Sequence, residues 1–144
     1  MIRYEHTQRG TVVLVSLLVG AVFCLFLQTL IPAARFAPIL VAGVLALSGF
    51  LFSSLTIQIT HQALSWRFGP GLIHKQVLLS EIQEVEVVRT DFLWGWGIHL
   101  TLRGWLYNVS GFQAVAVKLK SGKGFLLGTD EPGKLQAAIQ HTLS

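Results

Sequence analysis

The sequence predicts a membrane-anchored, mainly-β protein: a hairpin of two transmembrane helices, then a barrel or sandwich of about seven antiparallel strands closed by one C-terminal helix. Three observations predict this fold class. Two stretches of 25 residues, 10–34 and 36–60, contain no charged residue. Apolar and polar residues alternate from residue 56 onward, and helical spacing returns only at the C-terminal end. We therefore divide the chain into a tail and hairpin, 1–55, and a polar domain, 56–144.

Composition argues against an ordinary soluble enzyme. Of the 144 residues, 52% are hydrophobic and 12% are charged, whereas a soluble domain has about 25% charged residues. The net charge of +4 is small and dispersed, which is not the clustered basic face of a nucleic-acid-binding protein. The single cysteine, Cys24, leaves no intramolecular disulfide, and the scattered histidines predict no metal site. We expect no cofactor.

The helices are expected near residues 11–31 and 37–55, because about 20 residues cross a hydrocarbon core of about 30 Å. Two prolines and Arg35 lie between them and predict a short connection. A secretory signal peptide is the competing interpretation of the first segment. Its apolar run is longer than the signal core of about 7–15 residues, which favours an uncleaved helix.

Basic residues near the helix ends predict the orientation. Arg3 and Arg9 precede the first helix, and Arg67 and Lys75 follow the second, whereas Arg35 stands alone between the helices. By the positive-inside rule, both termini and the polar domain are cytoplasmic in a multi-pass protein of the inner (plasma) membrane. Small or polar residues share one face of each span, which predicts helix packing or self-association rather than a transport path: Ser16, Gly20, Cys24 and Gln28, then Ala42, Ala46, Gly49 and Ser53.

Period-two patterns define the strands of the polar half. Residues 115–119 and 125–127 alternate on either side of the turn 121–124, which predicts a hairpin. Residues 72–79 and 82–88 are rich in strand formers without clean alternation, which predicts a bulge or burial on both faces. A terminal amphipathic helix follows a capping sequence, with these residues in order: Thr129, Asp130, Glu131 and Pro132, then Leu135, Ala138, Ile139 and Leu143.

From about residue 56 to the end, the chain resembles the bacterial pleckstrin-homology-like (bPH) domain of small membrane-anchored proteins. The resemblance depends on five segments: Trp66-Arg67-Phe68-Gly69-Pro70-Gly71, Leu79-Ser80-Glu81-Ile82, Gly95-Trp96-Gly97-Ile98, Arg103-Gly104-Trp105-Leu106-Tyr107-Asn108-Val109-Ser110-Gly111 and Gly128-Thr129-Asp130-Glu131-Pro132. It implies a PH-like barrel at the membrane with no catalytic residues to transfer. Phosphoinositide-binding relatives carry basic residues in the loop that corresponds to residues 61–63, and here that loop has no Lys or Arg.

Two aromatic segments are candidate binding sites. Phe92, Leu93, Trp94 and Trp96 stand beside glycines, a composition suited to an anchor at the headgroup layer. The alternative is that both tryptophans pack against the barrel or the helices, with the glycines forming a turn.

Arg103, Trp105 and Tyr107 are candidate partner-binding residues, because Trp, Tyr and Arg are frequent hot spots. The alternative here is structural: a carboxylate neutralises Arg103, Trp105 lies in the core, and residues 108–111 form a turn capped by a side chain.

We therefore expect a membrane-anchored PH-like binding or scaffold module on the cytoplasmic face of the inner membrane. Its expected partners are the bilayer and a protein, or less favourably a lipid, and not nucleic acid. The alternatives are an accessory subunit of a membrane transport or secretion complex, and an enzyme that modifies lipid or envelope substrates. Glu84 and Glu86 share one strand face, which indicates a solvated edge rather than an acid–base pair, so we expect no enzyme activity.

Overall fold

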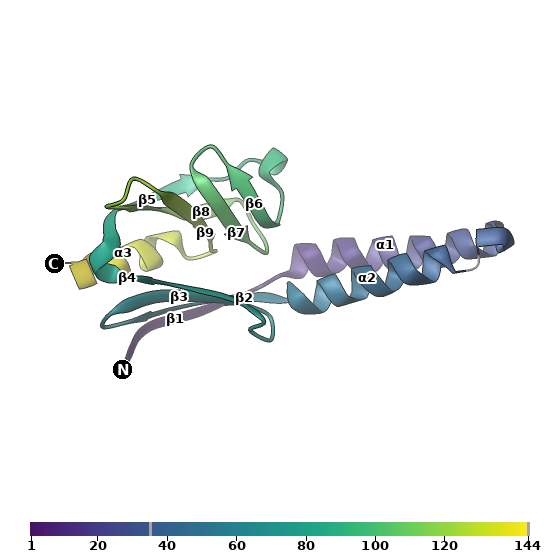
Figure 1. Cartoon of the computed structure of the whole chain (residues 1–144), viewed down its shortest axis with the longest axis horizontal. Helices are drawn as coiled ribbons and strands as arrows, with labels where there is room; N and C mark the ends of the chain where they lie inside the picture. The colour runs from purple at the N-terminus through teal and green to yellow at the C-terminus, as the bar shows by residue number, and fades with distance from the viewer. Residues whose placement is uncertain (35, 144) are drawn as a thin grey trace.

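A computed structural model describes residues 1–34 and 36–143, apart from the side chain of Phe92. Two β-sheets form the layers of a mainly-β body, with a C-terminal helix between them, and a pair of helices projects from one end of this body (Figure 1). Both chain termini lie near the opposite end of the body. The expected mainly-β body with a terminal helix is confirmed.

The projecting helices are α1 (Thr11–Leu30) and α2 (Ala37–Leu51), which run side by side and are joined through a short 3-10 turn, η1 (Pro32–Ala34). Gly20 and Gly49 lie where they approach each other: a Cβ on Gly20 would lie 3.3 Å from Leu45, and one on Gly49 would lie 3.6 Å from Leu17. Small residues thus let the two helices pack closely, as predicted.

The second helix is shorter than the expected 37–55, because β2 begins at Ser54. Of the helices in the described part of the chain, α1 is long and apolar enough to cross a membrane, whereas α2 has 15 residues.

The first sheet has the order β1-β2-β3-β4 and is antiparallel throughout. Its strands are β1 (Ile2–Arg9), β2 (Ser54–Thr60), β3 (Ala63–Phe68) and β4 (Ile73–Leu78). The N-terminal segment was expected to be a tail, and it instead forms β1, paired along its length with β2. The helical hairpin is therefore inserted between two neighbouring strands of one sheet.

The second sheet has the order β5-β8-β9-β7-β6. It contains β5 (Ile82–Arg89), β6 (Gly97–Thr101), β7 (Gly104–Asn108), β8 (Gln113–Leu119) and β9 (Gly124–Gly128), and two further 3-10 turns, η2 (Leu79–Glu81) and η3 (Phe92–Trp94), precede β5 and β6. The β8–β9 hairpin confirms the predicted one. Of the two segments expected to have a bulge or burial on both faces, residues 82–88 have a register shift between Ile82 and Glu84, whereas β4 in the segment 72–79 pairs without a shift and is mostly exposed. The described residues form nine strands rather than about seven, and their two separate sheets fit the expected sandwich rather than a closed barrel.

One strand pair differs from the expected antiparallel pattern: β9 lies between β7 and β8 and runs parallel to β7. Glycines on β7 and β9, at the places where the two strands meet, permit this close approach. A Cβ on Gly104, whose φ is +110°, would lie 1.9 Å from the carbonyl oxygen of Gly124, and one on Gly128 would lie 2.2 Å from the side-chain oxygen of Asn108.

The core lies between the two sheets. The Trp66 ring stacks on Phe125 with centroids 4.7 Å apart, and Tyr107 packs against Trp66 at 5.2 Å. The helix α3 (Pro132–Leu143) inserts Leu135 and Ile139, both fully buried, into the same core. The predicted terminal helix is thereby confirmed, and its stripe is confirmed in part, because Leu143 is 40% exposed.

Candidate functional site

The junction between helices and body is rigidly built. The Gly10 N–H, between β1 and α1, donates to the carbonyl of Ser53 at 2.8 Å, so the strand pair continues to the base of the helices. Gly10 is buried, and a Cβ there would lie 2.5 Å from the carbonyl oxygen of Phe52. The two helices therefore leave the sheet at a defined place and direction.

The loop 109–112 covers this junction. Its conformation is held by Asn108, whose side-chain oxygen accepts from the Ser110 N–H at 3.2 Å and whose amide donates to the carbonyl of Gly111 at 3.3 Å. The amide of Gln8 in β1 donates to the carbonyl of Ser110 at 3.0 Å. The side-chain-capped turn inferred from the sequence is present, and it ties β1 to the second sheet.

The tryptophan segment lies beside this loop, on the side of the body from which the helices project (Figure 1). The Trp96 indole N–H donates to the carbonyl of Gly111 at 3.2 Å, and its ring contacts Phe112. Trp94 packs over a small cluster on the outer face of the second sheet. Leu93 projects, with 92% of its surface exposed. Both tryptophans are thus partly buried in protein contacts. The side chain of Phe92, also expected at the headgroup layer, lies outside the part of the chain that the structure describes.

The three candidate partner-binding residues lie in different environments. Arg103 pairs with Glu86 at 3.3 Å, and Tyr107 is 3% exposed in the core, where its ring is unavailable to a partner. Trp105 is 47% exposed, contrary to the core position considered for it. Glu86 lies on the edge strand β5, so the predicted solvated edge is observed.

Two residues that the sequence analysis did not select accompany Trp105. Leu100 is its cross-strand neighbour and is 70% exposed, and Leu102 at the β6–β7 turn is fully exposed. A signal was present in the sequence, since an apolar residue at the tip of a two-residue turn is unusual. Together Leu100, Leu102 and Trp105 form an apolar patch on the free edge of the second sheet, here called the β6 edge.

The backbone of the β6 edge is also available for pairing. Thr101 and Gly104 flank a two-residue turn and form a hydrogen-bonded pair, and such pairs alternate along an antiparallel ladder. The N–H and C=O groups of Ile98 and Leu100 therefore point away from β7. Because β6 ends the strand order, no strand in the described part of the chain takes them up.

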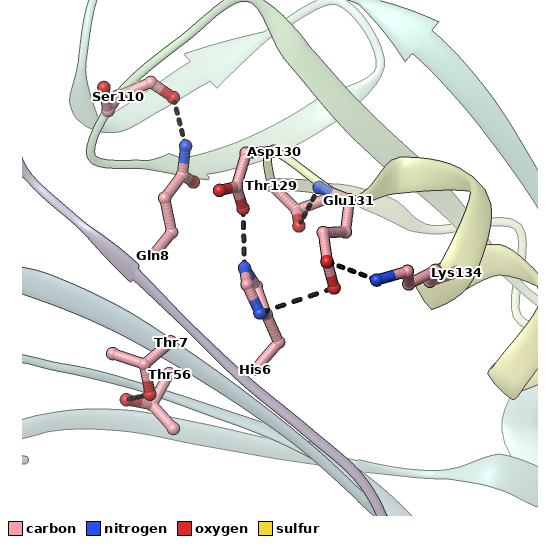
Figure 2. Close-up of polar contacts among 9 residues, drawn as sticks. All are labelled: His6, Thr7, Gln8, Thr56, Ser110, Thr129, Asp130, Glu131 and Lys134. Carbon is pink, nitrogen blue, oxygen red and sulfur yellow. Dashed lines mark hydrogen bonds and ion pairs between the residues drawn. The ribbon is translucent and has the colours of Figure 1, made fainter.

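A polar cluster joins β1 to the start of α3 (Figure 2). His6 approaches Asp130 through Nε2 at 2.6 Å and Glu131 through Nδ1 at 3.5 Å, and Glu131 also pairs with Lys134 at 2.5 Å. The Thr129 hydroxyl accepts from the Glu131 N–H at 3.1 Å and forms a turn that precedes α3; since α3 begins at Pro132, this bond is not the expected N-cap. The cluster lies across the edge between β1 and α3 and lines none of the cavities described below. It therefore fits a structural contact that holds β1 to α3 better than a catalytic centre.

Tyr4 lies beside the same carboxylates. Burial, with the negative charges of Glu131 and Asp130, raises the pKa of Tyr4 to about 12 from its ordinary value of 10.0, because each disfavours the phenolate. Its hydroxyl is buried and makes no hydrogen bond to the described residues.

We expect this pKa to make stability fall at high pH. Above about pH 10 the unfolded chain loses the Tyr4 proton while the folded chain keeps it, so stability declines until the folded phenol ionises near pH 12. Tyr4→Phe removes this contribution. The melting temperature of the variant should fall less than that of wild type between pH 9.5 and pH 11.5, while the two curves stay parallel from pH 7 to pH 9. Equal slopes in the alkaline range would contradict the assignment.

The comparisons with known proteins add no relative: family models, curated proteins and solved structures each give no match to this chain.

Proposed function

We propose that the chain is a membrane-anchored PH-like module that binds a protein partner through the β6 edge. The observation that carries the proposal is the combination, at the free edge of the second sheet, of exposed apolar side chains from β6, β7 and their turn and the outward-facing backbone groups of β6. Leu100, Leu102 and Trp105 supply the side chains. An extended peptide can add to such an edge, with its backbone giving affinity and its side chains giving specificity.

The anchor in this proposal is the α1–α2 hairpin crossing the inner membrane twice. The 20 residues of α1 span about 30 Å, the thickness of a hydrocarbon core. The large apolar side chains of both helices are exposed on the faces away from the helix pair, as lipid contact requires. In this proposal α2, which begins near the tip of α1 and returns to the same sheet, crosses the same thickness of membrane as α1. The uncharged residues 52 and 53 extend the apolar segment beyond the end of α2.

Two further features support an uncleaved, cytoplasm-facing module. Removal of the first helix as a signal peptide would take β1 with it and leave the first sheet without a strand. The basic residues Arg9, Arg67 and Lys75 all lie on the body side of the hairpin, which is the cytoplasmic side by the positive-inside rule. The PH-like assignment is supported by the two-sheet body closed by a C-terminal helix, together with the sequence resemblance.

The helix contacts favour this module over an accessory subunit. Gly20 and Gly49 are used within the hairpin itself, where they meet Leu45 and Leu17, so these small residues are not free to receive foreign helices. A role in a transport complex would therefore use the body or the outer helix faces. An enzyme of lipid or envelope substrates is the remaining alternative.

The test is site-specific photocrosslinking in intact membranes. A photoreactive residue at Leu102 should give one adduct of defined mass, and the same probe at Gln62, in the exposed β2–β3 loop of the other sheet, should not. Combining the Leu102 probe with Leu100→Ser and Trp105→Ser should lower the adduct yield by more than tenfold, because two anchors of about 1–2 kcal/mol each are lost.

Equal yields from positions 102 and 62, or an adduct that survives both serine substitutions, would refute the β6 edge as the binding surface. An adduct of twice the chain mass would show that the protein bound at the β6 edge is a second copy of this chain and not a different protein. Retention of the combined variant in alkali-washed membranes serves as the control for insertion.

A further inference from the structure

The outer face of the first sheet carries a basic group close to the helices. In the strand register Arg67 lies opposite Thr56 on one side and His74 on the other, so Arg67 and His74 share the outer face. Lys75, opposite the buried Trp66, starts from the other face of the edge strand β4 and lines the same cavity at the sheet edge. All three basic side chains are exposed. No carboxylate belongs to the residues that line the cavity around them.

The cavity has a volume of about 360 Å³ and runs from the β3–β4 loop along both strands. Its lining consists of Ser65, Trp66, Arg67, Pro70, Gly71, His74, Lys75 and Gln76. The carbonyl oxygen of Gly71 lies 3.1 Å from Nδ1 of His74 and can accept a hydrogen bond from it, which leaves Nε2 as the remaining polar atom of the ring. The Lys75 ammonium lies 5.5 Å from the centre of the Tyr107 ring, which holds its stem along the sheet edge.

This cavity lies at the membrane end of the body if the hairpin is inserted. The Gly69 N–H donates to the carbonyl of Ser54 at 2.8 Å, and a Cβ on Gly69 would lie 2.7 Å from the carbonyl oxygen of Leu51, the last residue of α2. Arg67 is two residues from Gly69, a distance of about 7 Å along a strand. Leu72 in the same loop is 74% exposed, so an apolar tip accompanies the basic cavity.

We propose that the Arg67, His74 and Lys75 cavity binds the phosphate of an anionic phospholipid headgroup. The Arg67 guanidinium and the Lys75 ammonium supply several N–H donors to a phosphate, and the absence of a lining carboxylate leaves their charge unopposed. The site would fix the rotation of the body on the membrane, and with it the height of the β6 edge. This inference rests on the membrane insertion proposed above.

The other end of the body supplies an internal comparison. The β2–β3 loop at His61 and Gln62 follows the full length of β2, about 23 Å from the helix base at 3.3 Å per residue. A larger cavity of about 660 Å³ there is lined by His61 and Lys120 among other residues, but inserted helices would hold it away from the bilayer. The position of a basic cavity relative to the hairpin, and not basic charge alone, therefore decides lipid contact.

The experiment uses the full-length protein, purified in detergent, and native mass spectrometry. Wild type should retain phosphatidylglycerol in preference to phosphatidylcholine. Arg67→Gln/Lys75→Gln should lower this preference by about tenfold or more, whereas Lys120→Gln/Lys123→Gln, which removes the same charge at the far end, should preserve it. Lys75→Arg keeps the charge and should retain binding, which separates loss of the site from loss of folding.

Equal lipid preference in the two double glutamine variants would overturn the proposal. Displacement of phosphatidylglycerol by millimolar inorganic phosphate would also overturn it, because the site would then be one for a free anion. Alkaline extraction of membranes from the same cells distinguishes the two proposals: a chain that is extracted refutes the anchor, whereas a retained chain without lipid preference refutes this cavity alone.

Discussion

Gly10→Ala should destabilise the protein at the junction between helices and body. The added Cβ would lie 2.5 Å from the carbonyl oxygen of Phe52 and 3.3 Å from Val109, and the first of these atoms belongs to backbone that is held by the strand pair. Overpacking of this kind costs about 1–3 kcal/mol, and it also strains the bond from Gly10 to Ser53. The melting temperature in detergent should fall by about 5–10 °C.

Gly43→Ala is the matched control for this substitution. Gly43 lies in α2, and a Cβ there meets no atom within 4 Å. The alanine should leave the melting temperature unchanged or raise it slightly, since alanine favours a helix over glycine by about 1 kcal/mol. If both variants melt alike, the junction is looser than the hydrogen bond and close contact at Gly10 indicate.

Asn108→Leu should have a comparable effect at the loop that covers the junction. Asn108 is fully buried, and its side chain satisfies the Ser110 N–H and the Gly111 carbonyl. A leucine of similar size leaves the Ser110 N–H without this partner, whereas the Gly111 carbonyl keeps the hydrogen bond from the Trp96 indole. An unmade hydrogen bond of this kind costs about 1–3 kcal/mol. We expect a fall of about 10 °C in melting temperature and loss of hydrogen-exchange protection at the Ser110 amide.

Ser110→Ala provides the control within the same loop. The contacts of Ser110 with Asn108 and Gln8 use its backbone N–H and carbonyl, so the substitution preserves both. Its melting temperature should stay within about 2 °C of wild type. Unchanged exchange protection in the Asn108 variant would show that the turn is held by the chain on either side and not by the amide.

Local patterns were sufficient for the elements whose partners are close in sequence. The β8–β9 hairpin follows from alternation on both sides of the turn 121–124, and α3 follows from the proline at its first position and a stripe that includes Leu135 and Ile139. The apolar run of α1 and the bulge at the start of β5 could also be predicted from the sequence, because each depends on the composition of its own segment.

Other features required the tertiary structure. The residues of β1 show no alternation of apolar and polar side chains, because its inward residues are Tyr4, His6 and Gln8, which face the polar groups of residues 110 and 130–131. Its identity as a strand depends on β2, which lies beyond the whole hairpin. The end of α2 at Leu51 has the same cause, since pairing with β1 takes Ser54 into the sheet.

The candidate binding residues show the same division. Alternation places Trp105 and Tyr107 on one face of β7, and the sequence alone determined that much. Which of them is buried was decided by the opposite sheet: Tyr107 lies over Trp66 in the core, whereas Trp105, beside Leu100, remains about half exposed. Strand periodicity is a property of the chain, but burial depends on how far the facing layer extends, and only the packing of the two sheets determines that extent.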